Sequence, residues 1–141
     1  MMQFRKILTI LGLMVCQGSV FALTFAIPKN SDIIGTLQSA TVQKGETLGD
    51  IGRRFDIGVY EMIEANPKVN AWNPRTGTKV VVPTQFIIPN VEHEGIVINL
   101  AEMRLYFFEP EFQQVSTHPI GIGRKGWITP VGTAKVTHKK K

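Results

Sequence analysis

The pattern of apolar and polar positions divides the chain into a helical part and a later part made of short strands. Apolar residues recur at three- and four-residue steps over residues 48–55 and again over residues 59–66, and each stretch predicts a short helix with one buried stripe. Pro67 ends the second helix, because the residue before a proline is pushed out of the α region. An extended piece at residues 41–44 precedes the helices, and residues 79–83 form a closing strand.

The start of the first helix carries a local signal. Thr47 can accept a hydrogen bond from the backbone three residues on, and Asp50 can reach back to the backbone of Thr47, which is the arrangement of a capping box. Gly49 and Gly52 weaken this helix by about 1 kcal/mol each relative to alanine. For Gly52 the alternative is that it allows another element to pack closely.

The later part follows a period of two. An apolar run at residues 96–100 and an alternating run at residues 103–108 predict a strand pair joined at residues 99–102. Residues 115–122 and 132–137 predict a third and a fourth strand. Between the two parts, residues 86–89 are apolar and bounded by proline, which favours a packed connector. One face of the second strand carries Met103, Leu105 and Phe107.

The N-terminus has the layout of a secretory signal peptide. Arg5 and Lys6 precede an apolar run over residues 7–15, and small residues follow. Cleavage after Ala22 fits best, and a cut after Ala26 is the second choice. The alternatives are an uncleaved membrane anchor that runs to Ile27 and a lipoprotein acylated at Cys16, where bulky Val15 stands in place of the expected small residue.

Charge and cysteine content exclude several classes of function. The formal charge of +5 loses Arg5 and Lys6 on cleavage and becomes +3, a mild excess that does not predict nucleic-acid binding. Cys16 is the only cysteine. After cleavage the chain has neither a disulfide nor a cysteine ligand for a metal. We expect no metal site and no cofactor, because the sequence has no phosphate-binding loop in a strand-turn-helix setting and no cluster of metal ligands.

Three separated motifs in the helical part, GETL at residues 45–48, EANP at 64–67 and GTKVVVP at 77–83, give it a resemblance to LysM modules. The resemblance implies a βααβ fold that binds glycans containing N-acetylglucosamine, such as peptidoglycan or chitin. Thr47 and Asn66 also have purely structural roles as helix caps, and Trp72 either stacks on a sugar or packs at the edge of the module. By motif, the binding groove would lie between Gly45, Glu46, Thr47 and Leu48 on one side and Asn66, Pro67, Lys68 and Val69 on the other.

The run HEGIVINLAEMRLYFF at residues 93–108, followed by TPVGT at 129–133, resembles the start of the L,D-transpeptidase catalytic domain of the ErfK/YbiS group. The resemblance implies a mainly β domain in which a cysteine thiolate, assisted by a histidine, attacks a peptidoglycan stem peptide and passes the acyl group to an amine. The family's Ser-His-Gly-Cys segment does not occur in the chain, so we predict no catalytic residue in it. His93, His118 and His138 are expected to be hinge or strand-surface histidines.

Together these features predict an α+β protein in which a small βααβ LysM module is followed by the first strands of an incomplete, mainly β catalytic domain. The predicted function is that of a secreted, peptidoglycan-associated L,D-transpeptidase family protein, truncated and inactive by itself; the alternative is a non-catalytic glycan-binding protein. Its expected partner is peptidoglycan, without nucleic acid, and the acyl acceptor is either another stem peptide or a lysine of an outer-membrane lipoprotein. Its expected location is the periplasm or cell envelope. We expect the LysM module to fold independently and residues 95–141 to be partly ordered or prone to aggregate unless more protein follows them. The predicted segments are a signal peptide at 1–22, a lead-in at 23–40, the LysM module at 41–83, a linker at 84–94 and the incomplete catalytic part at 95–141.

Overall fold

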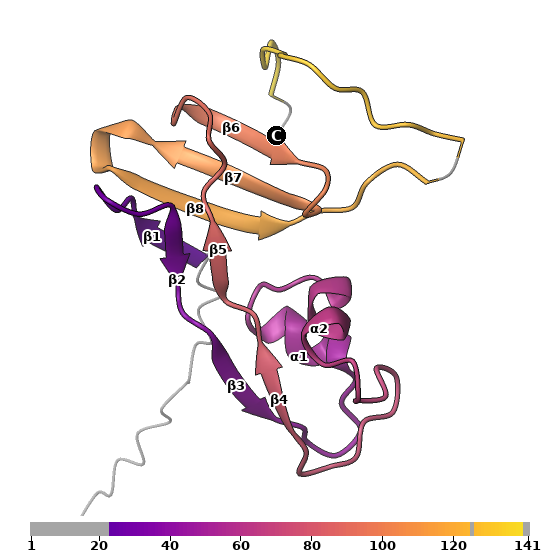
Figure 1. The fold of residues 1–141 in the computed structure, drawn as a ribbon. Helices are drawn as coiled ribbons and strands as arrows, with labels where there is room; N and C mark the ends of the chain where they lie inside the picture. The colour runs from indigo at the N-terminus through magenta and orange to yellow at the C-terminus, as the bar shows by residue number, and fades with distance from the viewer. Residues whose placement is uncertain (1–22, 125, 140–141) are drawn as a thin grey trace, which may run out of the picture.

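The structure is a computed structural model that describes residues 23–124 and 126–139 (Figure 1). The predicted leader, with Arg5, Lys6, Cys16 and Ala22, lies outside the described residues. The fold is α+β, as predicted. Its elements are β1 (Leu23–Ala26), β2 (Ile33–Gly35), β3 (Gln38–Thr41), α1 (Leu48–Arg54), α2 (Val59–Ala65), β4 (Lys79–Val82), β5 (Gln85–Ile87), β6 (Gly95–Asn99), β7 (Arg104–Glu109), a 3₁₀ turn (Pro110–Phe112) and β8 (Gln114–Pro119).

Residues 38–82 form a compact unit that we call the helical module. Its order is β3, α1, α2, β4, and β3 pairs with β4 in antiparallel fashion, with Gln38 opposite Val82 and Thr41 opposite Lys79. The predicted βααβ order is therefore confirmed. The first strand begins earlier than the sequence pattern suggested, because the backbone pairing with β4 covers Gln38–Thr41.

The capping box at the start of α1 is formed as predicted. The Thr47 hydroxyl accepts from the Asp50 N–H at 3.1 Å, and the Asp50 carboxylate accepts from the Thr47 N–H at 2.9 Å and from the Thr47 hydroxyl at 2.6 Å. Arg53 also contacts this carboxylate. These hydrogen bonds, with that of the Thr47 side chain first, lower the pKa of Asp50 from its ordinary 3.8 to about 2.

Two further residues fix the helices against each other and against β4. A Cβ atom on Gly52 would lie 2.6 Å from the carbonyl oxygen of Ile57 and 3.1 Å from the Met62 side chain, so this glycine allows close packing. The buried Asn66 side chain donates to the carbonyls of Met62 and Val81, and it accepts from the Val81 N–H at 2.8 Å. Asn66 thus acts as a strand partner for β4 and joins the end of α2 to it.

The segments predicted as a lead-in and a linker both contribute strands. β2 pairs with β5, with Ile34 opposite Phe86. Because β2 leads into β3 and β4 leads into β5, the two pairs form one bent ribbon that runs out of the helical module (Figure 1). Phe86 and Ile88 are buried, which confirms the packed connector.

The second part is a four-stranded antiparallel sheet in the order β1-β8-β7-β6. The predicted strand pair forms with Gly95 opposite Phe108 and Asn99 opposite Arg104. β8 is the predicted third strand, although it ends at Pro119. β1 comes from the far N-terminal side of the chain and pairs with β8, with Phe25 opposite Val115.

The fourth strand predicted at residues 132–137 was wrong. Within the described residues that follow β8, residues 120–124 and 126–139, the structure contains turns and coil without a helix or strand. Gly132 has a φ of +133°, which interrupts an extended run at its first residue. No neighbouring strand of the described part offers a hydrogen-bonded partner to these residues.

The buried face of β7 is the one opposite Met103, Leu105 and Phe107. Arg104, Tyr106 and Phe108 are each about 1% exposed, whereas Phe107 is 37% exposed. On the same outer face, Ile96 and Ile98 of β6 are more than half exposed. The sheet therefore turns a face that contains an arginine toward the ribbon and the helical module, and turns an apolar face outward.

The buried apolar side chains form one continuous cluster that spans both parts of the molecule. Members from the helical module, such as Leu48 and Met62, belong to the same cluster as Phe86 of the ribbon and Tyr106 and Val115 of the sheet. This packing argues against the expectation that the helical module folds independently. None of the described helices is long and apolar enough to cross a membrane.

The capping box predicts a specific dependence of stability on pH. Because the pKa of Asp50 is lower in the folded chain than its ordinary value, the carboxylate stabilises the fold above pH 3.8, and this contribution is lost as the pH falls through about 2. We expect the free energy of unfolding to fall less steeply between pH 3.8 and about 2 in the Asp50→Asn variant than in the wild type. Urea unfolding of the variant and the wild type from pH 5 to pH 2 measures this free energy, and the same dependence on pH in both would contradict the assignment.

Candidate functional site

The two predicted rims of the groove, residues 45–48 and 66–69, lie at the same end of the helix pair. α1 begins at the first rim, and α2 returns to the second. The Leu48 N–H donates to the carbonyl of Ala71 at 2.9 Å, which ties the first rim to the loop that follows the second. The fold thus brings together two segments that are about 20 residues apart in sequence.

The first rim is shaped by its backbone. Gly45 has a φ of +80°, with open space where a side chain would project. The Glu46 carboxylate accepts from the Gln43 N–H at 2.9 Å and lies 3.4 Å from the Arg54 guanidinium, so this side chain closes its own turn. Thr47 is occupied by the capping box, and Leu48 is fully buried.

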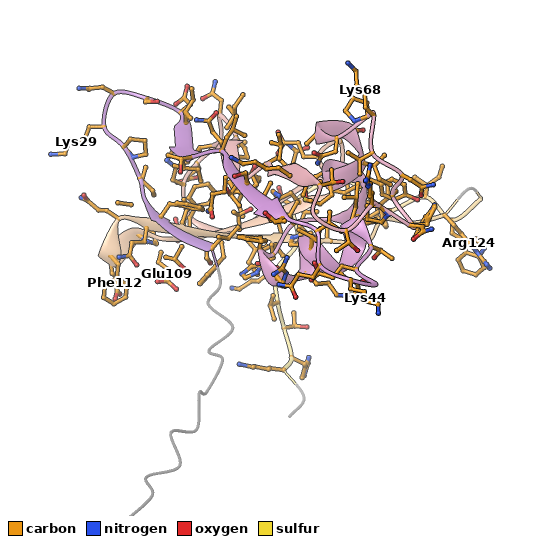
Figure 2. The ribbon with its side chains drawn as sticks, turned by 90° about the horizontal axis from the view of Figure 1, so that it is seen from below. Lys29, Lys44, Lys68, Glu109, Phe112 and Arg124 are labelled. Carbon is orange, nitrogen blue, oxygen red and sulfur yellow. The ribbon has the colours of Figure 1, made fainter. Side chains whose placement is uncertain are left out.

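The second rim has one buried and two exposed residues at its start. The Asn66 side chain is committed to Met62 and Val81, as described above, whereas Pro67 and Lys68 are exposed. Figure 2 shows Lys68 pointing to solvent on the side of the module away from Lys44. The Val69 N–H donates to the Asn66 carbonyl at 3.0 Å, which closes the turn after α2.

A large aromatic side chain stands next to this arrangement. Trp72 directly follows Ala71, the residue that accepts from Leu48, and is 73% exposed. The Asn70 side chain accepts from the N–H groups of Trp72 and Asn73, each at 3.0 Å, and so fixes the loop that presents the indole. Of the two alternatives for Trp72, packing at the edge of the module is wrong, because most of its surface is open to solvent.

Apart from the exposed ammonium group of Lys68, the site offers neutral contacts. These are turn backbone and an aromatic face, which suit hydroxyl and amide groups and an apolar ring face. The described residues contain no group of three histidine, cysteine or acidic side chains that could hold a metal. His118 lies on β8 with its ring 2.8 Å from the Asp56 carboxylate, and His93 stacks on Phe108 at 4.7 Å, so each has a structural contact.

Arg104 and the residues that surround it were not among the residues predicted from the sequence. The Arg104 guanidinium forms a bidentate pair with Glu61 of α2, at 3.0 Å and 2.9 Å, and lies 4.2 Å from the centre of the Phe86 ring. Close by, Tyr106 donates to Glu102 at 2.9 Å; burial, together with this bond, raises the pKa of Tyr106. The sequence did contain a signal for this ion pair, because an arginine stands within the apolar alternation of residues 103–108. An arginine buried in such a strand requires a charged or polar partner.

Comparison with known proteins supports both resemblances. The LysM domain family model matches residues 40–83. Probable L,D-transpeptidase YbiS from Escherichia coli is 42% identical over 123 residues, which cover 84% of this chain and 40% of YbiS. Probable L,D-transpeptidase ErfK/SrfK from the same organism is 33% identical over 138 residues, which cover 96% of this chain and 44% of the relative.

A third relative, Probable L,D-transpeptidase YcfS from Escherichia coli, is 35% identical over 116 residues, covering 80% of this chain and 36% of YcfS. The chain thus spans less than half of the length of these curated relatives. A solved structure of a MoCVNH3 variant in complex with (N-GlcNAc)4 is 23% identical, and the match covers 58% of this chain and 54% of the chain in that structure. Its TM-score of 0.32 is too low to indicate a shared fold. The chain contains a LysM domain and is related in sequence, over most of its length, to the L,D-transpeptidases YbiS, ErfK/SrfK and YcfS.

Proposed function

We propose that the chain binds the N-acetylglucosamine-containing glycan of peptidoglycan through the surface formed by residues 45–48, residues 66–69 and Trp72. The observation that carries this proposal is the match of residues 40–83 to the LysM domain family, in a fold where both rims meet beside an exposed indole. Similarity to L,D-transpeptidases favours peptidoglycan over chitin as the polymer.

Within this surface the residues have different roles. Thr47, Leu48 and Asn66 hold the rims in place, because their side chains are engaged in the cap, in the core and with β4. The turn backbone at Gly45 and at Pro67–Lys68 contacts the acetamide and hydroxyl groups of the sugar. Trp72 stacks on the apolar face of a sugar ring and supplies the largest single contact.

The similarity beyond the LysM domain supports a second, larger role. The match to YbiS extends over 123 residues and so includes the sheet as well as the helical module. We propose that β6–β8 belong to the sheet of an L,D-transpeptidase-type domain, which releases the terminal D-alanine of one stem peptide and transfers the acyl group to an amine of another stem or of a lipoprotein. The family that the chain resembles uses a cysteine thiolate as the nucleophile of this step. The only cysteine in the chain is Cys16, in the predicted leader, so binding rather than turnover is the activity proposed for these 141 residues.

The proposed location is the cell envelope, reached through the signal peptide. The sequence left two cleavage sites open, after Ala22 and after Ala26. A cut after Ala26 would remove β1, whose residues Leu23–Ala26 all pair with β8. We therefore expect the exported protein to begin at Leu23, as measured by intact mass and N-terminal sequencing. A mature chain that begins at Ile27 would contradict this expectation.

The binding proposal is tested by retention on purified peptidoglycan sacculi. We expect Trp72→Ala to weaken binding about fivefold or more, since loss of one aromatic contact costs about 1 kcal/mol or more. Trp127→Ala is the matched control: its indole is 70% exposed but lies in the coil after β8, and its removal should leave retention unchanged. Wild-type protein that washes through the sacculi would refute the binding function, and an equal loss with both variants would refute the placement of the site.

A further inference from the structure

One arginine from the sheet contacts the helical module at two separate places. Arg104, at the start of β7, donates through Nε and Nη2 to the two carboxylate oxygens of Glu61. The same Nη2 donates to the backbone carbonyl of Asp56 at 3.2 Å. The Arg104 side chain is 1% exposed and that of Glu61 is 23% exposed, so the pair is largely removed from solvent on the arginine side.

Both contacts fall at the end of the helix pair opposite the two rims. Asp56 lies in the turn between α1 and α2, and Glu61 lies in the first turn of α2, where it also accepts from the Gly58 N–H at 2.7 Å. The rims begin at the other ends, with Leu48 as the first residue of α1 and Asn66 as the cap of α2. A change in the splay of the helices at Arg104 would therefore change the separation of the rims.

The helix pair and the turn that joins it depend on packing against their surroundings. Each helix has only seven residues, which is well below the roughly 12–15 residues that a helix needs to persist by itself. Asp56 has a φ of +54°, a conformation that is uncommon outside glycine and persists when surrounding contacts hold it. Those contacts come from the sheet: Arg104 holds the carbonyl, and the His118 ring holds the carboxylate at 2.8 Å.

We infer that the Arg104–Glu61 pair is a positioning device for the glycan site, which sets the spacing of the two rims and with it the affinity of the LysM domain. The inference rests on the proposed function, since it assigns an affinity to that site. In this protein the neighbouring sheet thus acts on the LysM groove from the opposite end of the helix pair, and the glycan and the sheet are thermodynamically coupled through α1 and α2. Coupling of this kind is reciprocal, so bound glycan strengthens the contact between the helices and β7.

The test breaks the pair and measures binding of a tetramer of N-acetylglucosamine by titration. We expect Glu61→Gln to raise the Kd about fivefold to tenfold. Arg104→Lys keeps the charge but loses the bidentate geometry, and we expect it to raise the Kd by a similar factor. Thr117→Val is the matched control. It removes the bond of 3.1 Å between Arg104 Nη1 and the Thr117 hydroxyl, on the sheet side, and leaves both contacts to the helices; its Kd should stay within about twofold of the wild type.

A second readout, hydrogen exchange without glycan, separates this inference from the proposed function. In the Glu61→Gln and Arg104→Lys variants we expect faster hydrogen exchange at the Leu48 and Val69 amides, whose hydrogen bonds close the two rims. The amide of Val80 in β4 should stay protected, which would show that the variant is folded. Unchanged exchange at both rims, or an unchanged Kd in variants that bind, overturns the inference. Absence of binding by the wild type to both the tetramer and purified sacculi would refute the proposed glycan site, and the exchange rates would still decide whether Arg104 positions the rims.

Discussion

The fold depends on the burial of one guanidinium group. Arg104 is almost completely removed from solvent, and an ionised group in that position is tolerated only when it is paired and hydrogen-bonded. The structure meets this requirement from three elements: Glu61 and Asp56 on the helical module, Thr117 on β8, and the face of Phe86 on the ribbon. Loss of one partner of such a pair costs about 3–5 kcal/mol, because the remaining charge stays buried.

This requirement accounts for which face of the sheet is buried. Both faces of β7 are rich in apolar side chains, so hydrophobicity alone does not decide between them. The face with Arg104 turns inward because its partners lie on α2 and the preceding turn, and Tyr106 and Phe108 are then carried into the shared core. Ile96, Ile98 and Phe107 consequently remain outside. The ion pair thus fixes the orientation of the sheet relative to the LysM domain, and the bent ribbon of β2–β5 and β3–β4 holds the two parts at close range.

Local features of the molecule could be predicted from the sequence, and non-local ones could not. The two helices, the capping box at Thr47 and the strand pair β6–β7 were predicted correctly, because neighbouring residues determine them. The pairing of β1 with β8 was missed, since it joins residues about 90 positions apart. The strand expected at residues 132–137 has suitable residues but no partner strand in the described part of the chain, and a strand does not persist without one.

The same distinction applies to the candidate site. The motifs located both rims, and the structure brings the rims together through Leu48 and Ala71. The motifs could not separate residues that hold the rims, such as Asn66, from residues that remain exposed, such as Lys68. For Asn66, this distinction depends on its hydrogen bond with Val81, a residue 15 positions later in the chain. For Arg104, the sequence supplied an arginine in an apolar strand but not the position of its partner 43 residues earlier.

Arg104 and the shared core are expected to make the LysM domain and the sheet one cooperative unit. Native-state hydrogen exchange at increasing denaturant tests this directly, by comparing the opening free energy at Val80 in β4 with that at Tyr106 in β7. If the two parts unfold together, the two values merge into one global unfolding transition. Two distinct transitions, with the LysM domain still protected after the sheet has opened, would contradict it.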